Sequence, residues 1–104
     1  MQRGEVWWVN FPEPIGKRPA LLLSRDQVYS TRTSVTVASI TSTIRHIPVE
    51  VLLGVEDGMS RDCVANLDEI HTIANTRIIE KISTLSEEKM QAVKRAVIYA
   101  LDLD

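Results

Sequence analysis

Cysteine and histidine are almost absent from this sequence. Cys63 is the single cysteine, and the two histidines, His46 and His71, stand 25 positions apart. One thiol cannot form an internal disulfide, and these few residues match no ligand spacing of a zinc site. We therefore expect no metal and no cofactor, and we expect Cys63 to be a packing residue rather than a nucleophile.

Long apolar runs and a surplus of positive charge are also missing. The longest apolar runs, such as residues 20–23, are far too short to span a bilayer, so no membrane association is expected. The 12 Lys and Arg residues stand against 14 Asp and Glu residues, and the net charge of -2 argues against coating nucleic acid by bulk charge. The first residues lead straight into a strand-like segment, so we expect no signal peptide and a cytoplasmic location.

The charges that are present are unevenly spread over the 104 residues, a length typical of a single domain. Residues 1–50 carry six basic and four acidic side chains, whereas residues 51–104 carry six basic and ten acidic ones. A polyanion would therefore meet the N-terminal half first. The competing interpretation is a surface charge that is scattered without function.

Strand-like segments fill most of the first 85 residues. Apolar runs and alternating patterns predict strands at residues 5–9, 20–24, 34–41, 47–53, 62–65, 70–73 and 77–85. Residues 11–19 hold three prolines and one glycine and are expected to form a loop, and residues 26–33 a polar turn.

The C-terminal segment changes to a helical period. Ser86 is placed to cap a helix, with Glu87 and Glu88 in its first turn. Apolar residues then recur every three or four positions, at Met90, Val93, Val97, Ala100 and Leu101. Many short strands followed by one helix predict a mainly β fold, a small and strongly bent sheet or barrel closed by a terminal helix.

Two adjacent cations stand at the end of the proline-rich loop, in Gly16-Lys17-Arg18-Pro19. Arginine is planar, always charged and able to hold two phosphate oxygens together. Placed where a strand begins, Arg18 would project from a rigid scaffold. The alternative is a pair of solvated surface charges.

Three successive hydroxyls, Thr41, Ser42 and Thr43, end another predicted strand, with Arg45 just beyond. Such hydroxyls can bind phosphate or ribose oxygens, or they can simply bind their own backbone at a strand end. Neighbours in a strand point to opposite faces, so in the pair Trp7-Trp8 one indole is expected in the core and the other partly exposed. A phosphate-binding glycine loop, a Gly-x-Ser-x-Gly elbow and a clustered His-Glu metal motif are all absent from the sequence.

Taken in chain order, these pieces resemble the MazF/PemK family of toxins from bacterial toxin–antitoxin pairs. The resemblance rests on five segments: Arg3-Gly4-Glu5-Val6-Trp7, Gly16-Lys17-Arg18-Pro19 with the apolar run to Ser24, residues 35–42 ending in Ile-Thr-Ser, residues 62–73, and Leu85-Ser86-Glu87-Glu88-Lys89-Met90. Together they cover the chain nearly from end to end.

The resemblance implies an SH3-like β-barrel with a C-terminal helix, of the MazF/CcdB type, that works as a homodimer. It implies sequence-specific, metal-independent cleavage of single-stranded RNA, neutralisation by a cognate antitoxin, and no cleavage of DNA. By position, Arg18 and Thr41 correspond to the family's catalytic residues. The ribose 2'-OH would attack the neighbouring phosphorus and leave a 2',3'-cyclic phosphate and a 5'-OH. The residues that we expect to bind RNA, from the adjacent cations, the hydroxyl run and the tryptophan pair, are Lys17, Ser42, Thr43, Arg45 and Trp8.

The sequence departs from the family pattern at two places. The loop of residues 11–17 is shorter than usual, which leaves the recognised RNA sequence open, and Cys63 stands where serine is common. Two alternatives remain at this point. One is a gyrase-inhibiting toxin of the same fold, which would bind through residues 99–104. The other is a catalytically silent RNA-binding module.

Overall fold

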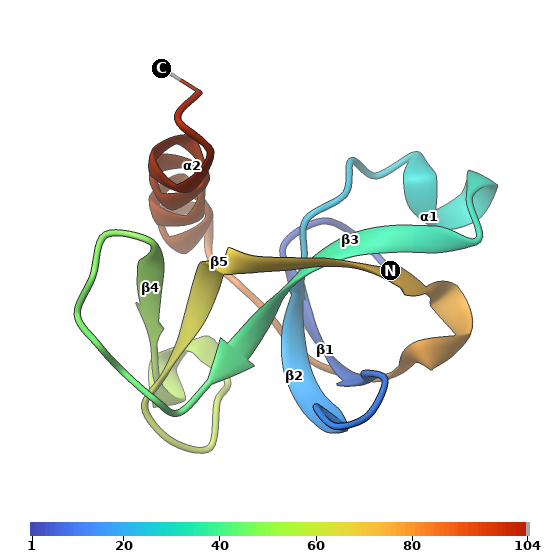
Figure 1. Ribbon diagram of the computed structural model, residues 1–104, viewed down its shortest axis with the longest axis horizontal. Helices are drawn as coiled ribbons and strands as arrows, with labels where there is room; N and C mark the ends of the chain where they lie inside the picture. Colours follow the sequence, from blue (N-terminus) through green and yellow to red (C-terminus); the bar gives the residue numbers. More distant parts are fainter. Residues whose placement is uncertain (104) are drawn as a thin grey trace.

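Six strands form one antiparallel sheet in the computed structural model, which describes residues 1–103 (Figure 1). The strands are β1 Glu5–Asn10, β2 Lys17–Leu22, β3 Ser34–Thr41, β4 Glu50–Leu53, β5 Cys63–Ala74 and β6 Ile78–Thr84. Two helices, α1 Val28–Thr31 and α2 Glu87–Leu101, and two 3-10 turns, η1 Val55–Asp57 and η2 Asn75–Arg77, connect and close them. Across the sheet the strands follow the order β4-β5-β3-β2-β1-β6.

The edges of this sheet are β4 and β6, which are not hydrogen-bonded to each other within residues 1–103. The expected mainly β fold with a C-terminal helix is therefore present as a bent, open sheet, and closure into a barrel is not detected. The bend has a local cause. The register shifts once between β3 and β5, after Ala38, and twice between β1 and β6, around Trp7 and Trp8, and such bulges kink and twist strands.

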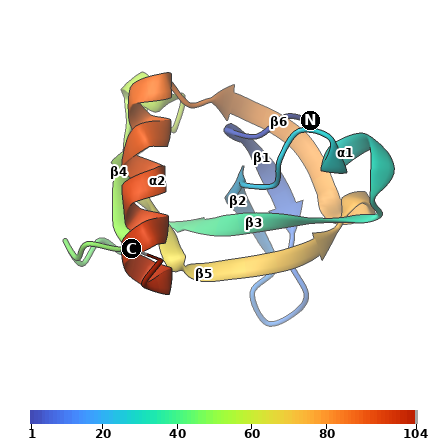
Figure 2. The same cartoon turned by 90° about the horizontal axis from the view of Figure 1, so that it is seen from above.

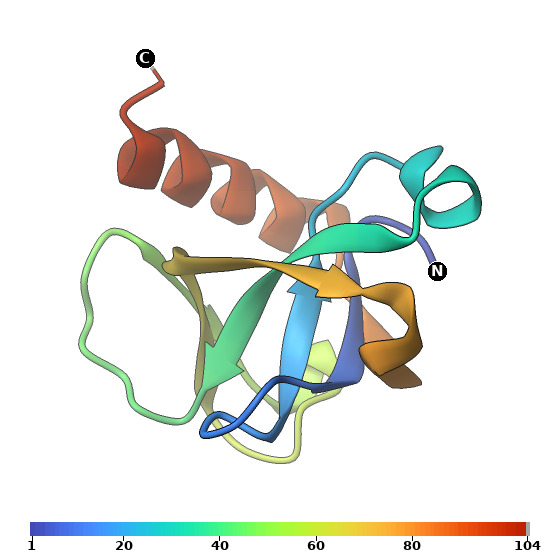
Figure 3. The ribbon, with the colours of Figure 1, turned by 45° about the vertical axis from the view of Figure 1, so that its right-hand side comes forward.

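Bending divides the apolar core into two clusters. One cluster lies under α2 and includes Val6, Leu21 and Val93, and the other includes Val9 and Leu22. Figure 2 shows α2 running alongside β4, whereas α1 lies at the far end of the sheet beside the start of β3 (Figure 3). Because Leu21 and Leu22 point to opposite faces and both are fully buried, β2 is covered on both sides and forms a rigid base.

The helix at the C-terminus begins as the sequence predicts. The Ser86 Oγ accepts a hydrogen bond from the Lys89 backbone N–H at 3.1 Å, and Val93 and Ala96 are buried against the sheet. No helix among residues 1–103 combines the length and the apolar character needed to cross a membrane. Asp104, the last residue of the segment considered for gyrase binding, lies outside the described residues.

Predicted boundaries were wrong in three strands, β2, β4 and β5. β2 starts at Lys17 and ends at Leu22, rather than covering residues 20–24, and β4 begins at Glu50, after Pro48. The two strands predicted at residues 62–65 and 70–73 are parts of the single strand β5. Proline is tolerated in β2 because Pro19 pairs with Trp8 of β1 before the ladder with β3 begins at Ala20, so the strand is locally an edge.

A buried carboxylate, Glu5, fixes the start of β1. Its Oε1 accepts hydrogen bonds from Trp7 Nε1 at 2.9 Å and from the Gln2 N–H at 3.1 Å, and Lys81 Nζ lies 3.3 Å from Oε2. Burial alone would raise the pKa of Glu5, but these hydrogen bonds and the Lys81 ammonium together hold the pKa below its ordinary value.

We expect Glu5→Gln to lower the free energy of unfolding by about 1 kcal/mol at pH 7, because it removes charge-assisted hydrogen bonds. A pKa that is lower in the folded state stabilises the protein above the unfolded pKa, and this contribution disappears as the pH falls through the folded pKa. The difference between the two proteins should therefore shrink at acidic pH. Urea unfolding across the acidic range measures it, and a constant difference would contradict the assignment.

Candidate functional site

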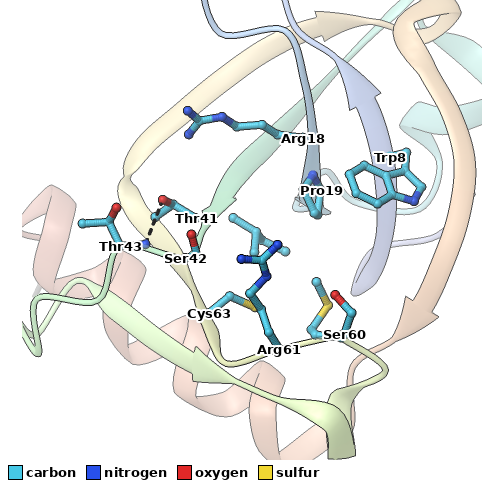
Figure 4. Close-up of a pocket in the computed structure, with 11 residues that line it drawn as sticks. Trp8, Arg18, Pro19, Thr41, Ser42, Thr43, Ser60, Arg61 and Cys63 are labelled. Atoms are coloured by element: carbon cyan, nitrogen blue, oxygen red, sulfur yellow. Dashed lines mark hydrogen bonds between the residues drawn. The ribbon is translucent and has the colours of Figure 1, made fainter.

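An open pocket of about 350 Å³ lies where β2 begins and β3 ends (Figure 4). Five of the site residues expected from the sequence line it: Trp8, Arg18, Thr41, Ser42 and Thr43. Six further residues complete the lining: Pro19, Ile40, Met59, Ser60, Arg61 and Cys63. No Asp or Glu is among these eleven residues, so the charge of the lining is positive.

The antiparallel arrangement of β2 and β3 places Arg18 and Thr41 at the same end of the two strands. β2 and β3 are antiparallel, and Ala20 is paired with Ser39. The ladder between the two strands ends at this pair. Arg18 lies two residues before Ala20 and Thr41 two residues after Ser39, so both stand at the same end of the two strands and both line the pocket. Two segments that are separate in the sequence thus form one wall of the pocket.

The hydroxyl of Thr41 is oriented by its own turn. Its Oγ1 accepts a hydrogen bond from the Thr43 backbone N–H at 3.2 Å. Because that bond occupies a lone pair, the hydroxyl hydrogen remains available to donate to an anion in the pocket. Thr41 therefore fits both interpretations of the hydroxyl run. Its oxygen accepts a backbone hydrogen bond at the strand end, and its hydrogen can still be donated to a ligand.

Arg18 has an exposed side chain that forms no hydrogen bond or ion pair within residues 1–103. It projects from β2, whose following residues are buried on both faces. An unpaired guanidinium on a rigid strand, next to a free hydroxyl donor, is suited to hold a phosphate.

Lys17 and Arg45 are outside the pocket lining. The Lys17 ammonium lies 5.1 Å from the centroid of the Trp8 ring, a cation–π contact that keeps it at the rim. Arg45 is exposed in the loop after β3, and its backbone N–H donates to a carboxylate oxygen of Glu50 at 3.0 Å. The pocket wall therefore contains five of the seven side chains that the sequence singled out.

Cys63 lies in the pocket lining but is only 4% exposed. Burial, together with the nearby carboxylates of Asp57 and Asp62, raises the pKa of its thiol. The thiol is therefore protonated at neutral pH, when it is a poor nucleophile. This environment favours a packing role for Cys63.

We expect Cys63→Ser to leave the RNA cleavage that the family resemblance implies nearly unchanged, because a buried, protonated thiol is a poor nucleophile. Burying a hydroxyl in place of the thiol should lower the free energy of unfolding by about 1–3 kcal/mol. Cleavage assays and urea unfolding of the same preparation measure both effects. Loss of cleavage in Cys63→Ser, with the fold intact, would show that the thiol takes part in the reaction.

Among residues 1–103, the His, Cys, Asp and Glu side chains form no group of three or more that could hold a metal ion. The fold and the pocket define a class: a small β protein with a C-terminal helix, whose open pocket combines guanidinium and hydroxyl donors for an anion. The chain belongs to the family described as PemK-like, MazF-like toxins of type II toxin–antitoxin systems, whose model matches residues 2–101.

Relatives found by sequence and by structure are toxins and endoribonucleases of the MazF type. The chain is 35% identical over 101 residues to the probable endoribonuclease MazF5 of Mycobacterium tuberculosis, across 96% of this chain and 92% of that protein. It is similar to the structure of the Mycobacterium tuberculosis toxin MazF-mt6, with a TM-score of 0.90, 30% identity and coverage of 96% of this chain and 98% of that chain.

A mycobacterial endoribonuclease solved in complex with its cognate antitoxin has the same fold, with a TM-score of 0.88 and 24% identity over 100% of this chain and 97% of that one. The resemblance to the MazF/PemK family and the mainly β fold with a C-terminal helix are thus confirmed. The roles of the individual pocket residues remain predictions.

Proposed function

We propose that this protein is an endoribonuclease that cleaves single-stranded RNA without a metal ion, and that the pocket is its active site. The observation that carries the proposal is the meeting of Arg18 and Thr41 in one open pocket whose lining holds no carboxylate. A phosphodiester is an anion, and this arrangement offers it a guanidinium and a free hydroxyl donor. Family membership and the endoribonuclease relatives support the same activity.

In the proposed reaction the nucleophile comes from the RNA. The ribose 2'-oxygen forms a bond to the adjacent phosphorus as its proton leaves, and the bond from phosphorus to the 5'-oxygen breaks as that oxygen takes up a proton. The products are a 2',3'-cyclic phosphate and a 5'-OH. Arg18 would stabilise the charge that develops on the phosphate oxygens and take part in proton transfer, and Thr41 would position the phosphate through its hydroxyl.

The remaining lining residues, and those at the rim of the pocket, would bind the rest of the RNA. Ser42 and Thr43 carry exposed hydroxyls next to Thr41, and Trp8 presents a half-buried indole to the pocket. Lys17 covers part of that indole, so a base that stacks there would meet a cation as well. Arg45, which lies outside the lining, would contact the RNA where the RNA leaves the pocket.

A single chain offers a pocket near the lower end of the size range of ligand sites, enough for one nucleotide. We therefore propose a homodimer whose two pockets continue into one groove for several nucleotides. A cognate antitoxin would neutralise the toxin by lying across that groove, as type II family membership supports. With messenger RNA as substrate, the activity is expected in the cytoplasm.

The test is incubation of the purified protein with single-stranded RNAs of varied sequence in EDTA. We expect cleavage, with new 5' ends that polynucleotide kinase labels without prior dephosphorylation. Intact RNA across all sequences, or products with 5'-phosphates, would refute the proposed activity. RNA binding without cleavage would favour the silent module, and inhibition of gyrase in a supercoiling assay without RNA cleavage would favour the gyrase alternative.

A further inference from the structure

A second arginine enters the pocket from a different part of the chain. Arg61 lies in the loop between η1 and β5, and its exposed side chain lines the same pocket as Arg18. Figure 4 shows the two guanidinium groups reaching in from separate walls, with Thr41 and Ser42 nearby. No sequence motif marks Arg61.

Arg61 has no anionic partner within residues 1–103. Its neighbour Asp62 is not among the pocket-lining residues. The Oδ1 of Asp62 lies beside Gly54, where it would be 3.1 Å from an added Cβ. In a chain with more acidic than basic residues, two arginines thus face one pocket without a carboxylate between them. Like charges held together in this way repel each other unless an anion lies between them.

The loop that carries Arg61 is held in place by a buried network. The Asp57 carboxylate accepts a hydrogen bond from the Gly54 N–H at 3.0 Å and lies 3.5 Å from Lys89 Nζ of α2. The Ser83 hydroxyl of β6 donates to the Asp57 carbonyl at 2.7 Å. These bonds tie η1, at the start of the loop, to a helix and to a strand, four residues before Arg61.

Gly58 makes this turn possible. Its φ is +85°, a left-handed conformation that favours glycine, and an added Cβ would lie only 2.5 Å from the Ser83 Cβ. The chain therefore packs tightly against β6 just before it turns towards the pocket. The buried side chain of Met59 follows, and Arg61 comes two residues later.

We propose that Arg61 binds a second backbone phosphate of the RNA, next to the one held by Arg18 and Thr41. Arg18 and Thr41 already offer donors to the phosphate that is cleaved, and Arg61 approaches from another wall. The identity of the ligand as RNA rests on the proposed function. Arg61 is then a residue that sets substrate affinity and position rather than one that drives the chemical step.

The experiment measures binding separately from cleavage. A short, fluorescein-labelled, fully 2'-O-methylated RNA pool of mixed sequence cannot undergo 2'-OH attack, so its fluorescence anisotropy gives the dissociation constant over a series of salt concentrations. For single strands, each phosphate contact adds about 0.7 to the slope of log affinity against log salt. We expect Arg61→Gln to bind more weakly at low salt and to reduce the slope by about 0.7.

Two matched variants make the result specific. Arg61→Lys keeps the positive charge and should retain most of the slope. Arg32→Gln removes the same charge from an exposed arginine outside this pocket, between α1 and β3, and should leave the slope unchanged. Equal slopes for Arg61→Gln, Arg32→Gln and the unaltered protein would overturn the proposal.

The outcome also separates this proposal from the proposed function. If the unaltered protein cleaves RNA and Arg61→Gln keeps the full salt dependence of binding, the second phosphate site is refuted and the nuclease assignment is supported. If no RNA is cleaved but the slope falls only in Arg61→Gln, the phosphate site stands and the nuclease assignment falls. In the cleavage assay, Arg61→Gln should raise KM while kcat changes little.

Discussion

Replacing Arg18 with alanine is expected to slow RNA cleavage by about a hundredfold or more, because removing one well-placed donor from a transition-state charge costs about 3 kcal/mol. The rate should be measured in single-turnover reactions with enzyme in excess over RNA. The side chain is exposed and unpaired, so the thermal unfolding midpoint should not change. The loss would then reflect chemistry and not folding.

The conservative variant Arg18→Lys provides the matched comparison. Lysine keeps the charge but loses the planar fork that holds two oxygens, so most of the loss should remain. Arg25→Ala removes an exposed arginine outside the pocket and should cleave at the normal rate. Full cleavage by Arg18→Ala would remove Arg18 from the mechanism.

Removing the nucleophile from the substrate should have a still larger effect. A 2'-O-methylated RNA, or DNA of the same sequence, has no free 2'-OH, so we expect no cleavage at any enzyme concentration. Both strands keep their phosphates, so they should still bind and compete with RNA for the pocket. Gel analysis of end-labelled strands, with the matching RNA as the positive control, measures this result.

Once the cleaved bond has been mapped, a sharper version becomes possible. A single 2'-deoxy nucleotide on the 5' side of that bond should block cleavage there, whereas the same change one step further along should not. Cleavage of the fully methylated strand or of DNA would mean that the attacking oxygen comes from water or from the protein.

Much of the fold could be predicted because local patterns and tertiary packing agree. Ser86 caps α2 as the sequence indicates. Of the predicted apolar stripe, Val93 is buried and Met90, Val97 and Ala100 are half-buried, whereas Leu101 is exposed. The sequence predicts two strands in place of β5, because Asn66, Asp68 and Glu69 interrupt its apolar run. In the structure the Asn66 side-chain oxygen accepts the Asp68 N–H at 2.9 Å, and the two acidic side chains are exposed, so the strand continues through polar residues.

The site was predictable where chemistry and chain position coincide. Arg18 stands near the start of β2 and Thr41 at the end of β3, and both lie in segments that resemble the family's motifs. Arg61 could not be found in this way, because residues 58–61 have the composition of an ordinary turn. The turn follows Asp57, which binds Ser83 of β6 and Lys89 of α2. Such long-range contacts leave no signal in the local sequence.

The composition of the pocket lining has a consequence for control. Its members are arginines, hydroxyl residues, apolar side chains and a thiol whose pKa is raised by burial. The lining contains no histidine, the side chain whose ordinary pKa lies closest to neutral pH. The loop before β5 is tied at Asp57 to α2 and β6, so this side of the pocket is shaped before a ligand arrives. An enzyme with such a pocket would be ready to act as soon as it folds, and a molecule that occupies the pocket would silence it.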